Sequence, residues 1–329
     1  MKILVTGSTG FVGAAVARHL LAEGHELRLL VRTASRRDNI ADLDAEIVVG
    51  DLTEPTSLAG AVKGCDALYH VAADYRLWVR DPRELYETNV GGSKALILAA
   101  SQAGVQRIVY TSSVAALGLT GDGTPADETT PVRREALVGH YKRSKYDAEQ
   151  SVLDLVTGRD CPVVIVNPST PIGPRDIKPT PTGRMIVQAA RGKMPAYVDT
   201  GLNVVHVDDV ARGHLQAFAK GRIGERYILG GENMTLARIL AAVAAQVGRK
   251  PPTVKLPHGL IMPIAMVATA LARVTGREPF VFTDAIRMAR KRMYFSSQKA
   301  EAELGYTHRP PDQAIADAVE WFLQAGYFG

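Results

Sequence analysis

The 329-residue chain contains few cysteines, and its histidines are scattered. The two cysteines, Cys65 and Cys161, lie in apolar stretches typical of strands, so we expect no disulfide framework and a reducing, cytoplasmic location. No Cys pair exists and the 8 His follow no ligand spacing, so no metal site is predicted.

Long hydrophobic runs are also scarce. The apolar start, residues 1–7, is too short for a signal peptide and runs directly into a folded motif. The most apolar later stretch, 260–272, contains Pro263 and falls short of the ~20 residues that span a bilayer. We therefore predict no transmembrane segment and expect a buried helix here. A helix lying on a membrane surface is the alternative, favoured by basic residues downstream: Arg287, Arg290, Lys291 and Arg292.

Charge of one sign is not in strong excess. The chain has 39 Lys+Arg against 34 Asp+Glu, a net charge of +5. This mild excess does not indicate a nucleic-acid partner and favours at most a weak attraction for anions such as phosphates. With 46% hydrophobic and 22% charged residues, the chain is typical of a globular protein of one large domain or two joined domains.

Strand and helix patterns alternate in the first half of the chain. This alternation predicts βαβ units, hence a Rossmann-type, doubly wound parallel α/β sheet with its ligand beyond the carboxyl ends of the strands. The expected strands are 2–6, 26–31, 47–49, 67–71, 107–111 and 162–166, and the expected helices are 11–23, 57–62, 85–103 and 141–155.

The pattern changes after Asn167. A Pro- and Gly-rich segment, 168–183, is expected to be an ordered loop. A strand at 204–207, a helix ending near 220, and amphipathic helices at 235–247 and 312–323 follow. We expect a dinucleotide-binding domain of 1–166, to which 203–228 returns. A smaller C-terminal substrate-binding lobe would comprise 167–202 and 229–329.

A glycine-rich loop lies between the first strand and the first helix. In Gly7-Ser8-Thr9-Gly10-Phe11-Val12-Gly13, Gly7 would permit the tight turn, Gly10 the approach of a pyrophosphate, and Gly13 close helix–strand packing. The N-terminus of the helix offers free N–H groups to phosphates. The predicted ligands in this loop are Gly7, Thr9, Gly10, Phe11, Val12 and Gly13.

The end of the second strand bears on the choice of cofactor. An acidic residue there would bind the ribose 2′-hydroxyl of NAD, but the sequence has Arg32, Arg36 and Arg37 with no acid before Asp38. Guanidinium groups suit a 2′-phosphate, so NADP(H) is favoured over NAD(H). Asp51, followed by Leu52, could accept from the adenine amino group or could cap a turn.

A Tyr and a Lys four residues apart, Tyr141 and Lys145, share one face of a predicted helix. The preceding strand ends in Thr111-Ser112-Ser113, which places hydroxyls at the ligand edge of the sheet. A free phenol titrates near pH ~10, so a neighbouring ammonium is expected to lower its pKa and make it a proton carrier. Ser113 would donate to the substrate oxygen and Tyr141 would transfer the proton.

Together these motifs resemble the extended short-chain dehydrogenase/reductase (NAD-dependent epimerase/dehydratase) superfamily over nearly the whole chain. Residues 30–32 and 110–113 resemble its dihydroflavonol-4-reductase-like branch, and 73–78 with 81–82 resemble the hopanoid-associated sugar epimerase group more narrowly. The resemblance implies that Ser113 and Tyr141 are catalytic, that Lys145 activates Tyr141 and binds ribose, and that Ala72, Ala73 and Pro168 lie against the cofactor. It also implies that the long helices 85–103 and 141–155 could form a homodimer.

Three functions stay open. The first is an NADP(H)-dependent reductase or dehydrogenase acting on a carbonyl or secondary alcohol. The second is a sugar epimerase that uses the same residues, against which Leu117-Gly118 replaces the Tyr-Gly pair frequent in such enzymes. The third is a non-catalytic dinucleotide-binding regulator. The substrate would be a small carbonyl compound, a sugar or a lipid-linked molecule, and its candidate contacts are Tyr75, Trp78, Ser113, Arg175 and Met185.

Overall fold

The computed structural model describes residues 1–328, and its centre is a seven-stranded, fully parallel sheet. The strand order is β10-β6-β5-β4-β1-β2-β3. The strands are β1 (Lys2–Thr6), β2 (Glu26–Val31), β3 (Glu46–Val49), β4 (Ala67–His70), β5 (Arg107–Thr111), β6 (Val163–Pro168) and β10 (Arg226–Leu229). The predicted doubly wound sheet is confirmed. The chain order reverses between β1 and β4, and the crevice beyond the ends of these two strands is where such sheets bind ligands.

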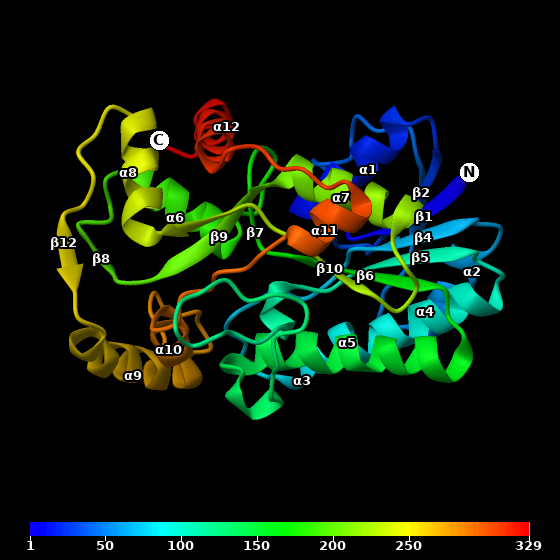
Figure 1. Cartoon of the computed structure of the whole chain (residues 1–329), viewed down its shortest axis with the longest axis horizontal. Coiled ribbons are helices and arrows are strands. Elements are labelled where there is room, and N and C mark those ends of the chain that lie inside the picture. The colour runs from blue at the N-terminus through cyan, green and yellow to red at the C-terminus, as the bar shows by residue number, and fades with distance from the viewer. Residues whose placement is uncertain (329) are drawn as a thin grey trace.

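Helices cover both faces of this sheet (Figure 1). One face carries α1 (Phe11–Ala22), α7 (Val207–Lys220) and α11 (Gln298–Leu304), and the other carries α2 (Pro55–Val62), α4 (Ser93–Gln102) and α5 (Gly139–Arg159). Successive side chains of a strand point to opposite faces, so Ile3 and Val5 join the core under α1 while Leu4 joins the core under α4. Strand β1 is therefore apolar on both sides, as buried parallel strands are.

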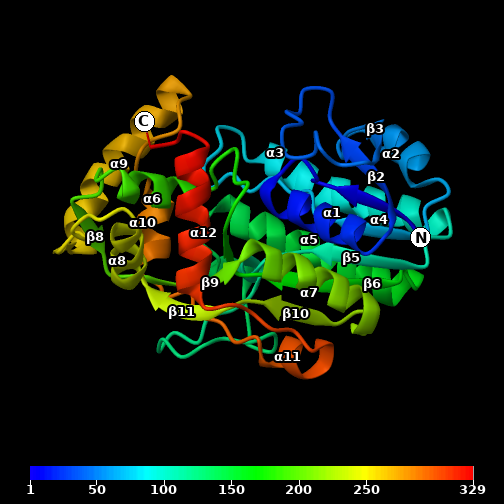
Figure 2. The same ribbon diagram turned by 90° about the horizontal axis from the view of Figure 1, so that it is seen from above.

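The remaining elements form a second lobe beside the carboxyl edge of the sheet (Figure 2). It contains a three-stranded sheet, β11-β9-β7, and a two-stranded sheet, β12-β8. Their bounds are β7 (Thr170–Ile172), β8 (Ala196–Val198), β9 (Gly201–His206), β11 (Glu232–Thr235) and β12 (Val254–Leu256). The helices are α6 (Pro181–Ala190), α8 (Leu236–Gln246), α9 (His258–Thr275), α10 (Thr283–Ala289) and α12 (Pro311–Gln324). Ile186, Ile239 and Phe322 join α6, α8 and α12 in one apolar core.

The two lobes exchange segments differently from the division expected from the sequence. Helix α11 lies within the range assigned to the second lobe, yet Ala300 and Leu304 pack into the core of the first. Strand β9, assigned from residue 203 onward to the first domain, pairs with β7 and β11 of the small sheet. Helix α7 and strand β10 return to the central sheet as expected. The positions of α11 and β9 differ from the expectation because long-range packing, and not the local pattern, decides them.

Two local segments also differ. The single helix expected at 85–103 begins as α3 (Arg83–Tyr86), passes through a π-helical turn, Glu87–Gly92, and continues as α4. The expected loop at 168–183 contains β7 and the first turn of α6.

The expectation that the apolar stretch 260–272 is a buried helix is wrong. The stretch is helical, within α9, but only Ala265 and Ala272 of that helix are buried. Leucine and valine side chains face outward, and Val274 is 83% exposed. Hydrophobicity alone suggested burial, whereas the fold leaves one face of this helix without a neighbour.

Candidate active site

The glycine loop after β1 is shaped by close backbone contacts. Gly7 has a φ of +72°, and a Cβ on it would lie 2.7 Å from the Ala72 nitrogen. A Cβ on Gly13 would lie 2.2 Å from the Gly7 carbonyl oxygen. These two positions accept only glycine, for the turn and for helix packing respectively. Because Ala72 also donates its N–H to Thr6 Oγ1 at 3.1 Å, the loop and the 72–73 segment are held together.

The helix that follows offers its N-terminus to an anion. Gly10 precedes α1 without a side-chain cap, and the first turn carries no acidic residue. The buried Ser8 hydroxyl has no hydrogen-bond partner within residues 1–328. Exposed N–H groups, a positive helix end and an unsatisfied hydroxyl fit a dinucleotide pyrophosphate.

The basic residues beyond β2 differ in their surroundings. Arg36 donates from Nε to Asp38 Oδ2 at 2.8 Å, so its guanidinium is already paired. Arg32 is exposed and forms no ion pair with any residue that the structure describes. Asp51 Oδ1 accepts from the Thr53 N–H and hydroxyl, both at 2.9 Å, so Asp51 takes the turn-capping role. The buried Leu52 packs against Gly92.

Lys145 lies buried below the end of β5. Its Nζ donates to the Thr111 carbonyl oxygen at 2.9 Å and lies 5.2 Å from the centre of the Tyr110 ring. Burial lowers the pKa of Lys145 to about 8, and the charge of Glu149 opposes this shift. The contact to β5 directs the ammonium towards the carboxyl edge of the sheet.

Tyr141 stands one turn earlier on α5, close to Ser113. Burial raises the pKa of Tyr141, and a hydrogen bond with the Ser113 side chain opposes the rise. Ser113 Oγ also accepts from the Ala115 N–H at 3.1 Å, where it caps a 3-10 turn, Val114–Ala116. The structure therefore places the three predicted catalytic residues at one edge. Lys145 does not reverse the rise in the Tyr141 pKa, in contrast with the lowering expected from the sequence.

A buried polar network supports this edge from below. Asn167 donates to the Ser113 carbonyl oxygen at 3.0 Å and to Glu149 Oε2 at 2.7 Å. Arg226 Nη1 donates to Glu149 Oε1 at 3.2 Å. The sequence analysis missed Glu149, although it lies four residues after Lys145 and so on the same helix face.

The π-helical turn brings a second amide to α5. Asn89 donates to Ser144 Oγ at 3.0 Å and to the Asp74 carbonyl oxygen at 2.9 Å, and its Oδ1 accepts the Asp74 N–H at 2.8 Å. This arrangement joins the segment that carries Asp74 and Tyr75 to α5. The charge of Asp74 also raises the pKa of Tyr141.

Not every predicted substrate contact lies at this edge. Arg175 Nη2 donates to Asp208 Oδ1 at 2.6 Å, so its guanidinium is engaged at the start of α7. Met185 packs against the core of the second lobe. Trp78 is half-buried, and no described contact joins it to Tyr141. Pro168 ends β6, directly after Asn167.

The sequence analysis missed one further carboxyl group, Asp176. It is buried, and its oxygens accept from the Thr180 N–H and hydroxyl at 2.8–3.0 Å. Burial raises the pKa of Asp176 to about 6, and its charge in turn raises the pKa of Tyr75. No sequence motif marks this residue, which lies in the second lobe, hydrogen bonded to the residue that caps α6.

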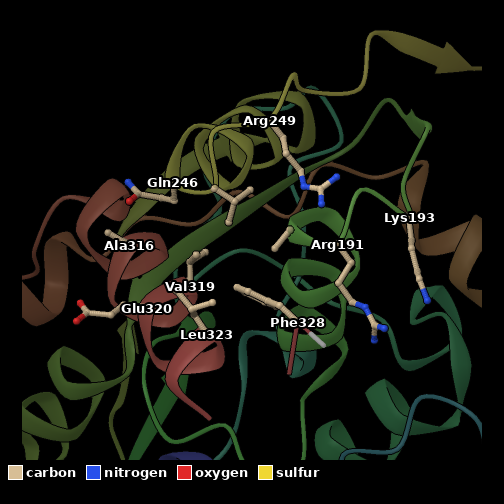
Figure 3. Close-up of a pocket in the computed structure, with 11 residues that line it drawn as sticks. Arg191, Lys193, Gln246, Arg249, Ala316, Val319, Glu320, Leu323 and Phe328 are labelled. Carbon is tan, nitrogen blue, oxygen red and sulfur yellow. The ribbon is translucent and has the colours of Figure 1, made fainter. Parts of the chain in front are cut away.

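A separate cavity of about 700 Å³ lies in the second lobe between α6, α8 and α12 (Figure 3). Arg191, Lys193 and Arg249 stand at its rim over an apolar floor that includes Val319 and Phe328. None of the predicted catalytic residues lines it. Within residues 1–328, no group of three or more His, Cys, Asp or Glu is placed to hold a metal ion.

Comparison with known proteins supports the family. The model of the NAD dependent epimerase/dehydratase family matches residues 3–230. A Synechocystis protein with the provisional name dihydroflavonol 4-reductase is 48% identical, covering 98% of this chain and 95% of its own. Sterol demethylase protein B of Methylococcus capsulatus is 36% identical over 99% of both chains.

Two solved structures share the fold along the whole chain. The crystal structure of gox2253 is 57% identical, with a TM-score of 0.90 and 99% coverage of both chains. A nucleoside-diphosphate-sugar epimerase from Pseudomonas aeruginosa, PA4631, is 28% identical, with a TM-score of 0.82 and coverage of 100% and 99%. With the glycine loop and the Ser113, Tyr141 and Lys145 edge in place, the chain is an enzyme of the extended short-chain dehydrogenase/reductase type and belongs to the NAD-dependent epimerase/dehydratase family.

Proposed function

We propose that this enzyme is an NADP(H)-dependent reductase that acts on a ketone, or on the corresponding secondary alcohol, of an apolar substrate. The observation that carries the proposal is the convergence of Ser113, Tyr141 and Lys145 at the sheet edge next to the glycine loop. When bound, the nicotinamide supplies or accepts the hydride. The residues of the chain then have to orient the carbonyl and move one proton.

Each of the three side chains has a distinct role in this proposal. Ser113 donates a hydrogen bond to the substrate oxygen, on which negative charge develops in the transition state. Tyr141 gives its phenolic proton to that oxygen during reduction and takes it back during oxidation. The Lys145 ammonium, held by the Thr111 carbonyl, favours the phenolate. Because burial raises the pKa of Tyr141 in the chain itself, the positive charge of an oxidised nicotinamide would assist Lys145 in the oxidation direction.

The preference for NADP(H) rests on Arg32. It lies just beyond β2, is exposed, and is not neutralised by a described carboxylate, while no acid occupies the position that would bind a free 2′-hydroxyl. A guanidinium binds a phosphate by charge-assisted hydrogen bonds, and a carboxylate there would repel it. Arg36 is the weaker candidate because it is paired with Asp38.

The apolar substrate class rests on the relatives and on Tyr75. The Synechocystis relative is named for a dihydroflavonol and the Methylococcus relative for a sterol. Tyr75 is 40% exposed on the segment that Asn89 joins to α5, and it provides an aromatic surface for such a ring system. A homodimer through α4 and α5 and a cytoplasmic location stay predictions.

A sugar epimerase, of the kind associated with hopanoids, is the second candidate. The P. aeruginosa neighbour is described as a nucleoside-diphosphate-sugar epimerase, and epimerases employ the same Ser, Tyr and Lys. In an epimerase the cofactor stays bound and is regenerated within each turnover. A non-catalytic regulator is disfavoured because the acid/base residues are all present.

Cofactor handling tests the proposal. The purified protein is titrated with NADPH and with NADH, and loss of reduced-nicotinamide absorbance is then followed with a panel of ring-bearing ketones. We expect tighter binding of NADPH and net oxidation that depends on a ketone. A cofactor that co-purifies and is never consumed, with a sugar nucleotide inverted, would instead establish the epimerase.

Two matched variants separate chemistry from folding. Tyr141→Phe should lower kcat by roughly 10²–10⁴-fold while NADPH binding persists. Tyr146→Phe removes a phenol from the same helix and should leave kcat unchanged. Equal turnover in the two variants would contradict the assigned role of Tyr141.

A further inference from the structure

The outward face of α9 carries a continuous apolar stripe. Leu260, Ile264, Val267, Leu271 and Val274 follow one another at alternating steps of four and three residues, so they lie along one side of the helix. Each is between 59% and 83% exposed. Phe280, just beyond the helix, is 98% exposed. Most surface helices turn their apolar side towards the protein core and their polar side towards water. An exposed apolar stripe of this size therefore marks an interaction surface.

The segment that contains the stripe carries an excess of positive charge. Residues 249–292 contain nine Lys or Arg and two Asp or Glu, a net charge of +7 in a chain whose total is +5. Arg273, Arg277 and Arg290 form no ion pair among the residues that the structure describes. The apolar stripe and the excess positive charge therefore belong to the same short segment.

Helix α9 is long enough to cross a membrane, but hydrogen bonds hold it against α10. By length and composition, α9 could cross a membrane. Its first residue is tied to the end of α10, where His258 Nε2 and the Ala289 carbonyl oxygen lie 3.1 Å apart. Thr283 N–H donates to Thr269 Oγ1 at 3.0 Å, in the middle of α9. A spanning orientation would break these contacts, whereas a helix lying flat keeps them and buries only the stripe.

We propose that the stripe on α9 docks this protein on the surface of a bilayer that contains anionic phospholipids. The apolar side chains enter the boundary between headgroups and acyl chains, and Arg and Lys side chains of the same segment bind the phosphates. A second copy of the chain fits this face less well, because a two-fold contact would bring the +7 segments of both copies together.

The surface adjoins the candidate active site. A Cβ on Gly139, two residues before Tyr141, would lie 3.5 Å from Asp284 of α10. Arg80, from the segment that follows Tyr75, lies against Gly276 at the end of α9. Docking would therefore hold the site next to the lipid, although the docking itself does not depend on the proposed reaction.

Vesicle flotation without substrate tests the proposal. The wild-type protein is mixed with vesicles of equimolar phosphatidylcholine and phosphatidylglycerol, or of phosphatidylcholine alone. We expect flotation with the anionic vesicles and much weaker flotation with the neutral ones. Val267→Gln with Leu271→Gln should weaken binding to anionic vesicles at least about tenfold. Arg277→Gln with Arg290→Gln should weaken it about tenfold and flatten its dependence on salt.

A matched control alters equally exposed apolar residues elsewhere. Ile223→Gln with Leu323→Gln, at 52% and 62% exposure, should float as the wild type does. Wild-type protein that stays unbound with both vesicle types would overturn the proposal. An equal loss of flotation in the Val267→Gln with Leu271→Gln variant and in the control variant would overturn it too. Sedimentation without lipid gives a third outcome. A dimer that Val267→Gln with Leu271→Gln dissociates would assign the face to a second copy and also overturn it.

Discussion

Asn167 and Glu149 form a buried hydrogen bond of 2.7 Å between the end of β6 and the middle of α5. The same amide nitrogen donates to the Ser113 carbonyl oxygen, so one side chain links α5 to the segment that follows β5. Arg226 of β10 completes the network from the neighbouring strand. The positions of Ser113 and Lys145 relative to each other therefore depend on three residues that are not among the predicted catalytic residues.

Removing the Glu149 carboxylate should destabilise the fold. Glu149→Ala removes one of two acceptors from Asn167 and one from the half-buried Arg226, and we expect the free energy of unfolding to fall by about 2–4 kcal/mol. Glu149→Gln retains one acceptor oxygen and should cost about half as much. Urea unfolding measures both. If the alanine variant matched the wild type, the network would have no role in stability.

Gly13 in the glycine loop and Gly91 in the π-helical turn should respond differently to replacement by alanine. Gly13→Ala places a methyl group 2.2 Å from the Gly7 carbonyl oxygen, so α1 must shift and stability should drop by about 1–3 kcal/mol or more. Dinucleotide binding should weaken with it, because the loop moves. Gly91→Ala meets nothing within 4 Å and should be neutral or slightly stabilising. Thermal unfolding and NADPH titration of both variants test the difference, and equal behaviour would contradict it.

Asp176 should make stability fall as the pH rises. An unfolded Asp loses its proton near pH 3.8, whereas burial raises the pKa of folded Asp176 to about 6. Between these values the folded state binds more protons, so raising the pH destabilises it by roughly 3 kcal/mol in total. Asp176→Asn should remove this loss, giving a variant that gains on the wild type from pH 4 to pH 7. Buried histidines act equally in both proteins and cancel in the comparison.

A second carboxylate provides the control of opposite sign. A hydrogen bond from the Thr129 side chain lowers the pKa of Asp127. That group contributes stability above its unfolded pKa and loses it as the pH falls, so Asp127→Asn should lose stability relative to the wild type at neutral pH. Chemical unfolding at several pH values measures both variants. The same pH trend in Asp176→Asn and Asp127→Asn would be inconsistent with the buried position of Asp176.

The two arginines after β2 should differ in their effect on the cofactor. Arg32→Gln removes an unpaired guanidinium, so the Kd for NADPH should rise about tenfold while the Kd for NADH stays unchanged. Arg36→Gln should have a smaller effect because Arg36 is 76% exposed and paired with Asp38. Fluorescence titration gives both constants. An equal rise for NADPH and NADH in Arg32→Gln would show that Arg32 does not bind the 2′-phosphate.

Local pattern was sufficient for the parts of this protein whose geometry lies within a few residues. The turn after β1 needs glycine at fixed steps, and the four-residue spacing of Tyr141 and Lys145 places both on one helix face. The alternation of strands and helices likewise predicts a parallel sheet, because a right-handed crossover permits few other arrangements. These expectations needed no knowledge of distant contacts.

Other features depend on which distant segments meet. The π-helical turn that directs Asn89 to Ser144, the amide of Asn167 between Glu149 and Ser113, and the return of α11 to the first domain join residues far apart in the chain. The outward face of α9 is the clearest case, since its composition suggested burial and the fold supplies no neighbour. Periodicity reports which side of an element is apolar, but whether protein, lipid or water covers that side depends on how the whole chain packs.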